Sequence, residues 1–311
     1  MAQAEGAVSW AAHQFEVYLV HAHLPRRMRG GVSFWAVAAG DFLPDFLSKF
    51  WVYGFTIGER HYGASVPHQW HRGWPGMGVT HTVAFGLVVA ALVWLWRRNR
   101  AATVGVALGC IVHVVADLGD TAGVMLLFPF STASFTLQLW AYGATSDGGK
   151  YLDAAAYYSS FGMVADVVWL VALLFSWRAL TRDHWRDEVV PAEPGLWRRL
   201  GTVMPERALL ALYRGLFFFG LCRMIAWALW AHVLAAPGVG GPLDLSAGGP
   251  WWIEARSLRP VPIWVVLPTA AAVLAAVYGA AIALWEPMGR AEARSRARRT
   301  ARIPTRQAAP D

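Results

Sequence analysis

A histidine and an aspartate four residues apart lie near the end of a hydrophobic stretch, Gly109-Cys110-Ile111-Val112-His113-Val114-Val115-Ala116-Asp117. In an α-helix this spacing puts His113 and Asp117 on one face, one turn apart. Asp41 and Asp45 have the same spacing in an earlier hydrophobic stretch. Ionisable side chains inside a membrane span are costly, so each pair is a candidate functional group with partners elsewhere in the chain.

Histidines in other parts of the chain could complete a metal site with these two pairs. Mixed imidazole and carboxylate ligands suit zinc, and also manganese or iron. We predict a divalent metal ion, with zinc preferred, held by His13, Asp45, His71, His81, His113 and Asp117. Asp41 is predicted to act as a general base or to orient a ligand. A bound ion lowers the pKa of a water ligand and polarises a phosphoryl or carbonyl oxygen, so this chemistry predicts a hydrolase.

The composition indicates a membrane protein. Of the 311 residues, 56% are hydrophobic and 15% are charged, whereas soluble domains carry about 25% charged residues. Pro44 is expected to kink or end the second of several apolar stretches, each close to the roughly 20 residues of a membrane-spanning helix. We predict an all-α, polytopic integral membrane bundle of about seven spans, or six if the first stretch lies flat at the interface. The stretches are 7–24, 31–50, 79–96, 101–119, 158–178, 208–235 and 263–285.

The distribution of basic residues predicts the orientation of these spans. With the C-terminus in the cytoplasm, the inside loops hold most of the 27 lysines and arginines, as the positive-inside rule requires. We therefore expect a multi-pass protein of the cell's inner or plasma membrane. The metal ligands then converge near the outer face, except that His21 and His23, the alternatives to His13, lie at the inner end of the first span. The inside loops are 24–30, 97–100, 178–207 and 286–311.

The arginines near the C-terminus are expected to orient the chain and to contact anionic lipids, and not to read nucleic acid. The segment from Arg290 to Arg306 is expected to be disordered. The predicted partners are therefore membrane lipids and a small-molecule or lipid substrate, with no nucleic acid.

Three motifs carry a family resemblance. Gly40-Asp41-Phe42-Leu43-Pro44-Asp45 resembles the G-x-x-x-P-D element of the YdjM-like predicted inner-membrane metal-dependent hydrolases. His71-Arg72-Gly73 and Thr80-His81-Thr82 resemble the H-R-G and T-H-S parts of a second element. The histidines of that element are normally five residues apart in the family, and here they are ten apart.

The third motif lies in the stretch described first. Gly109, His113 and Asp117 match the family's G-x-x-x-H-x-x-x-D element, and His13 fits its early histidine. The resemblance covers about residues 13–130 and implies a membrane-bound metallohydrolase. We accordingly expect a metal-site module of four helices at residues 1–130 and an additional three-span module with a basic cytoplasmic tail at 131–311.

Two arginines are predicted to bind substrate. Arg72 belongs to the H-R-G motif, and Arg223 is an isolated charge in the sixth span that could hold an anionic group such as a lipid phosphate. The alternative for Arg223 is a structural ion pair with Asp166, which would let both charges reside among apolar helices.

The sequence thus predicts metal-dependent hydrolysis of an ester or phosphoester, a lipid among the candidates, at the outer membrane interface. One alternative is a metal-ion or proton transporter, in which the polar residues would mark a pathway through the spans. The other is a non-catalytic membrane scaffold whose polar residues only hold helices together.

Overall fold

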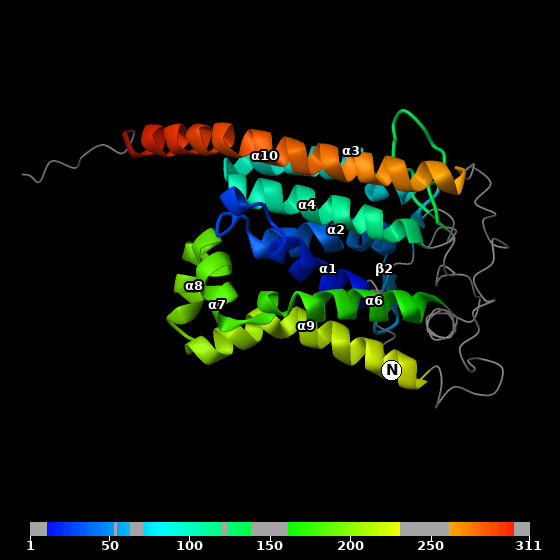
Figure 1. Cartoon of the computed structure of the whole chain (residues 1–311), viewed down its shortest axis with the longest axis horizontal. Helices are drawn as coiled ribbons and strands as arrows, with labels where there is room; N and C mark the ends of the chain where they lie inside the picture. The colour runs from blue at the N-terminus through cyan, green and yellow to red at the C-terminus, as the bar shows by residue number, and fades with distance from the viewer. Residues whose placement is uncertain are drawn as a thin grey trace, which may run out of the picture.

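The chain folds mainly into helices that lie alongside one another (Figure 1). A computed structural model describes residues 11–52, 55–62, 71–119, 123–137, 161–230 and 261–301. One antiparallel hairpin, β1 (Phe55–Ile57) with β2 (Arg60–Tyr62), lies in the loop after the second helix. The predicted helical class is therefore confirmed.

A helix occupies each of the predicted apolar stretches. The helices are α1 (Ala11–Ala22), α2 (Phe34–Val52), α3 (Val83–Arg97), α4 (Arg100–Ala116), α6 (Phe161–Phe175), α9 (Glu206–Leu229) and α10 (Ile263–Ala301). Three described helices are long and apolar enough to cross a membrane, namely α4 with its short extension, α9 and α10, while α3 and α6 are apolar but shorter. The seven-span arrangement therefore stays a prediction.

Shorter helices connect these elements. They are the 3-10 turns Arg26–Met28, Met77–His81 (η3), Asp117–Gly119 (η4), Trp177–Leu180 and Val190–Ala192, the π-helix Trp185–Val189, and the α-helices α7 (Arg182–His184) and α8 (Pro194–Gly201). The charged segment 178–207, expected as a loop, is thus largely built of short helical turns. The division of the chain near residue 130 stays a prediction.

The structure bears on two expectations about helix ends. Of the kink or end expected at Pro44, the end does not occur, because α2 continues to Val52, and the Ser48 hydroxyl donates to the Pro44 carbonyl at 2.8 Å. The expectation of disorder from Arg290 is wrong as far as Ala301, because α10 continues to that residue, and Arg302 and Arg306 lie outside the described residues. Alanine and arginine favour helix, and a Glu292–Arg296 ion pair of 2.5 Å adds i,i+4 support.

Helices α2 and α4 contact each other directly through their backbones. A Cβ atom on Gly40 would lie 2.3 Å from the Val106 carbonyl oxygen, and one on Gly109 would lie 2.1 Å from that of Val37. Small residues four apart, such as Gly105 and Gly109, permit this close approach between membrane helices. The contact brings the aspartates of α2 opposite the polar end of α4.

Helix α1 lies inside the bundle and packs against α2, α4, α6 and α9. Its Phe15, Val17 and Tyr18 side chains have no solvent exposure. The Tyr18 hydroxyl donates to the Tyr213 carbonyl of α9 at 2.5 Å. At the start of α1, the Asp166 carboxylate of α6 accepts a hydrogen bond from the Ala12 N–H at 3.1 Å. Neighbouring helices therefore fix both the depth and the direction of α1.

We predict that Gly109→Ala destabilises the protein by about 1–3 kcal/mol, because the added methyl group must push α2 away from α4. The matched control is Gly215→Ala on α9, where a Cβ atom would meet nothing within 4 Å. Alanine should there be neutral or stabilising by up to about 1 kcal/mol. Thermal unfolding in detergent compares the two variants, and equal unfolding temperatures would contradict the prediction.

Candidate metal centre

Four segments bring their polar side chains to one place inside the bundle. The first turn of α1, the middle of α2 and the end of α4 with η4 each supply side chains. The segment from residue 71 to the end of η3 supplies three more. The side chains brought together include every predicted metal ligand and the predicted base, and all are buried: His13, Asp41, Asp45, His71, Arg72, His81, His113 and Asp117.

Asp117 lies at the centre of this cluster. Its Oδ1 atom is 2.8 Å from the Arg72 guanidinium and 3.7 Å from His13 Nε2. Its Oδ2 atom is 3.1 Å from His113 Nε2 and 3.8 Å from His81 Nε2. One carboxylate therefore contacts side chains from α1, from the turn before α3 and from α4.

Asp45 forms a second centre next to the first. Its Oδ1 atom is 3.5 Å from His71 Nε2 and 3.4 Å from His81 Nε2, while Oδ2 forms an ion pair with Lys49 one turn further along α2. Burial lowers the pKa of His71 to about 4. The His71 imidazole is therefore neutral at pH 7 and has a nitrogen lone pair available to a metal ion.

Asp41 faces the two imidazoles on the α1 side of the cluster. Its Oδ1 atom is 3.8 Å from His13 Nδ1 and 4.0 Å from His113 Nδ1, and those two rings stack with 4.2 Å between centroids. The carboxylate is 1% exposed, and neither of its oxygens accepts a hydrogen bond from the described residues. A buried carboxylate without donors is costly unless a cation lies beside it.

Two histidines of the cluster are oriented by hydrogen bonds on the far side of the ring. The Thr80 hydroxyl donates its proton to the Met77 carbonyl, so it accepts one from His81 Nδ1 at 3.0 Å. In the neutral imidazole, His81 Nε2 is then an acceptor that faces two carboxylate oxygens. An acceptor facing carboxylates is unfavourable by itself, and a metal ion between them would remove the repulsion.

Glu16 holds the His13 ring from the far side, as Thr80 holds the His81 ring. Its Oε2 atom lies 3.1 Å from His13 Nδ1, which leaves Nε2 directed toward Asp117. A carboxylate on the outer nitrogen of a metal-bound histidine is a common support for such ligands. Glu16 and Lys49 are not among the predicted site residues. Their spacing could have indicated them, because Glu16 is three residues after His13 and Lys49 is four after Asp45, so each lies on the same helix face as its partner.

The other early histidines lie elsewhere. His21 is at the opposite end of α1, with Nδ1 3.1 Å from His184 Nε2 and Nε2 3.1 Å from the Val32 carbonyl oxygen. His23 is exposed and lies 2.8 Å from the Ser176 hydroxyl. Of the three early histidines, only His13 reaches the cluster.

The two predicted substrate-binding arginines have different surroundings. Arg72 is buried in the cluster and contacts Asp117. Arg223 lies half-buried on α9 and not among the buried side chains of the cluster. The structure therefore brings one of the two arginines to the site.

The donor set fits a divalent metal ion. Three groups of side chains have ligand atoms within 4.8 Å of one another: His13–Asp41–His113, Asp45–His71–His81 and His81–His113–Asp117. Four carboxylates gather here, those of Glu16, Asp41, Asp45 and Asp117, and the cations Lys49 and Arg72 face them. If all four carboxylates are ionised, their four negative charges exceed the two positive charges of Lys49 and Arg72 by two, the charge that one divalent ion would neutralise.

The fold and the site define a class, that of helical membrane proteins with a buried histidine–aspartate cluster. The chain matches the YdjM inner membrane protein family over residues 15–185, which is more than half of its length, and it belongs to that family. The match extends beyond the region 13–130 identified by motifs and includes α6. No curated protein and no solved structure matches the chain.

We predict that Arg72→Met destabilises chelator-treated protein by about 3–5 kcal/mol, because it leaves the Asp117 carboxylate buried without its cation. Adding Asp117→Asn should restore part of this loss, since the uncompensated charge is then absent. The matched control is Arg60→Met on the exposed strand β2, which should change stability by less than about 0.5 kcal/mol. Chemical unfolding measures all four proteins, and equal losses for the two arginine variants would refute the prediction.

Proposed function

We propose that this membrane protein is a metal-dependent hydrolase that cleaves an ester or phosphoester at the outer membrane interface. The observation that supports it most strongly is the cluster of buried carboxylates with imidazole nitrogens directed at them. Such an arrangement is stabilised by cations of higher charge than Lys49 and Arg72 supply. Zinc suits the mixture of imidazole and carboxylate ligands, and manganese and iron are the alternatives.

In this proposal two ions share the cluster. Asp45, His71 and His81 hold one ion, while His13, Asp41 and His113 hold the other, with Asp117 between the two groups. Asp41 is then a ligand and not a general base, because its carboxylate faces two imidazoles and has no described donor. Glu16 and Thr80 orient the His13 and His81 rings from the far side.

When bound, the ions would supply Lewis acidity to the scissile group and to an attacking water. The protein's own residues would bind the ions and orient the substrate. Arg72 is fixed against Asp117 and is the proposed contact for a negatively charged oxygen of the substrate. Burial of the cluster excludes bulk water, which strengthens each of these electrostatic contacts.

Aromatic side chains near the cluster support a membrane-interface substrate. Phe46, next to Asp45, is 68% exposed, and Trp51 on the same helix is 50% exposed. Trp74, two residues after Arg72, is also exposed and contacts the Phe128 ring at 5.1 Å. Aromatic residues are enriched where a protein meets the lipid headgroups. We therefore propose that the chain has seven spans, with the cluster at the outer face and the C-terminus in the cytoplasm. A lipid is a candidate substrate.

We expect purified wild-type protein to carry two equivalents of zinc, manganese or iron after reconstitution. Asp41→Ala and Asp45→Ala should each lose one equivalent, because they belong to different ligand groups. His23→Ala, which removes an exposed histidine at the opposite end of α1 from the cluster, should retain both. Elemental mass spectrometry on monodisperse protein gives the counts. A folded wild type that holds no metal after reconstitution would rule out the proposed centre.

We expect the metal-loaded protein to hydrolyse at least one member of a panel of phosphoesters and lipid esters. Chelation should abolish the activity and zinc or manganese should restore it, since the ions supply the Lewis acid. Asp45→Ala should be inactive and His23→Ala should keep wild-type activity. A protein that binds metal with the expected stoichiometry but cleaves nothing in the panel would favour the transporter alternative, which metal uptake into proteoliposomes tests directly.

A further inference from the structure

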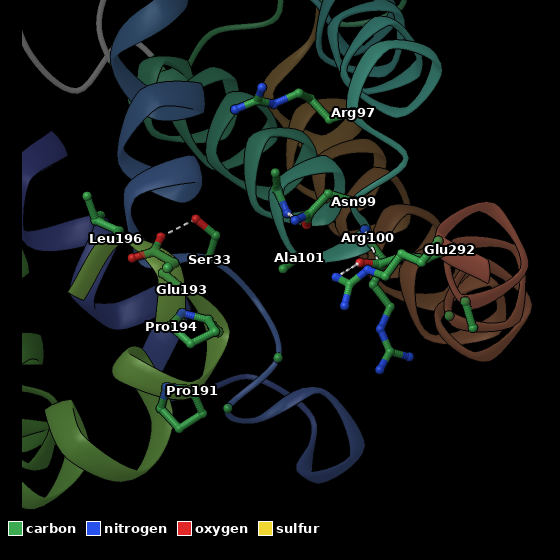
Figure 2. Close-up of a pocket in the computed structure, with 18 of the residues that line it drawn as sticks. Ser33, Arg97, Asn99, Arg100, Ala101, Pro191, Glu193, Pro194, Leu196 and Glu292 are labelled. Atoms are coloured by element: carbon green, nitrogen blue, oxygen red, sulfur yellow. Dashed lines mark hydrogen bonds and ion pairs between the residues drawn. The ribbon is translucent and has the colours of Figure 1, made fainter. Parts of the chain in front are cut away.

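A second polar site lies at the opposite end of the bundle from the metal cluster. It is a pocket of about 880 Å³ at the beginnings of α2, α4 and α8, with α10 along one side (Figure 2). Its distance from the cluster is about 20 Å along α4, measured from Arg100 to His113 at 1.5 Å per residue. The positive-inside expectation puts this end at the cytoplasmic side.

The charged residues that line the pocket are mainly arginines. They are Arg97, Arg100, Arg199 and Arg296, with Glu193 and Glu292 as the acidic members. Glycine, alanine and proline make up much of the remaining lining, for example Gly30, Ala102 and Pro191. Small side chains leave the volume open, and it lies within the range of pockets that hold small ligands.

Both glutamates already have structural roles at helix N-termini. Glu193 Oε1 accepts hydrogen bonds from the Ser33 hydroxyl and from the Trp35 N–H at 3.0 Å, which satisfies the start of α2 (Figure 2). Glu292 Oε2 accepts from the Arg100 N–H at 3.3 Å, which satisfies the start of α4. Helix N-termini carry partial positive charge and favour such anions. Glu193 therefore serves the start of α2, while Glu292 serves the start of α4 through Oε2 and pairs with the Arg296 side chain through Oε1 at 2.5 Å.

The arginines differ in how they are held. Arg100 donates to the Trp285 carbonyl at 3.3 Å, and its guanidinium lies 4.4 Å from the Trp285 ring centroid. A Cβ atom on Gly289 would lie 2.4 Å from the Arg100 guanidinium, so the glycine leaves room for it. This places one guanidinium rigidly in the wall of the pocket.

Arg97 and Arg199 are exposed arginines of the lining that, like the Arg100 guanidinium, form no ion pair with a carboxylate in the described part of the chain. Arg97 lies over the Trp96 ring at 4.6 Å, and in the described part of the chain neither arginine has a carboxylate within 4.0 Å. Arg97 ends α3 and Arg199 lies on α8, so the two guanidinium groups come from different elements that border the same space. Guanidinium groups match the oxygens of phosphate with paired hydrogen bonds.

We propose that this pocket binds a phosphate-bearing anion at the cytoplasmic end of the bundle. Arg97 and Arg199 contact the phosphate oxygens, and Arg100 supports them from the wall. The ligand would join α3 and α8 to α4 and α10, so its binding would hold together parts of the chain that are far apart in sequence. The phosphate belongs either to an anionic lipid headgroup of the inner leaflet or to a soluble molecule, and the experiment separates these two sources.

The test is native mass spectrometry on the full chain in detergent, with three probes. The probes are phosphatidylglycerol, phosphatidylcholine as the zwitterionic reference, and inorganic pyrophosphate as the soluble phosphate. The pocket variant is Arg97→Gln/Arg199→Gln. The matched control is Arg198→Gln/Arg294→Gln, which removes the same charge from exposed positions on α8 and α10 outside the pocket lining.

We expect wild type to bind phosphatidylglycerol or pyrophosphate, and the pocket variant to bind it at least about tenfold more weakly, because two charge-assisted contacts are lost. The control should stay within about twofold of wild type. Binding of phosphatidylglycerol alone identifies a lipid headgroup, and binding of pyrophosphate identifies a soluble ligand. Equal weakening in the two double variants would reduce the effect to general charge attraction and overturn the proposal, as would a wild type that binds neither probe. Size-exclusion profiles check that both variants stay folded.

Discussion

Buried negative charge is the constraint on which the rest of this structure depends. Glu16, Asp41, Asp45 and Asp117 lie close together where water is scarce, and each needs a donor or a cation. The backbone contact between α2 and α4 brings these groups together, because glycines such as Gly109 let the helix axes approach. Arg72, Lys49 and the histidines surround the carboxylates, and a divalent ion is the simplest species that would complete the balance.

The position of α1 explains how a helix so rich in polar groups can lie in a membrane protein. Its described part, Ala11–Ala22, carries two histidines and a glutamate in 12 residues. It is enclosed by α2, α4, α6 and α9, so His13, Glu16 and His21 meet protein and not lipid. The same enclosure accounts for a second polar contact, His21 with His184, at the far end of the helix.

Local spacing and charge distribution predicted much of the site. The i,i+4 pairs fix helix faces, and the positive-inside rule sends the ends of α2 and α4 to one side, so their convergence follows from the sequence. Two features of the site do not follow from the sequence. One is the role of Glu16, because tertiary packing determines which polar group on α1 faces inward. The other is the turn that brings the His71 and His81 ring centroids to 4.9 Å from each other. The helical segment from Arg290 to Ala301 shows a similar limit, since the helix propensity of alanine and arginine outweighs the run of charge that favours disorder.

The length of α10 has a consequence for the shape of the protein beyond the membrane. Its 39 residues make a rod about 58 Å long at 1.5 Å per residue, while the hydrocarbon layer is about 30 Å thick. If α10 crosses the bilayer as proposed, nearly half of the rod would project past the lipid tails, and its residues from Trp285 to Arg296 would lie beside the starts of α2 and α4. The arginines of its last turns would then lie on a rigid helix that runs from the headgroup region outward, which would extend the positive charge of this end of the protein along the helix axis.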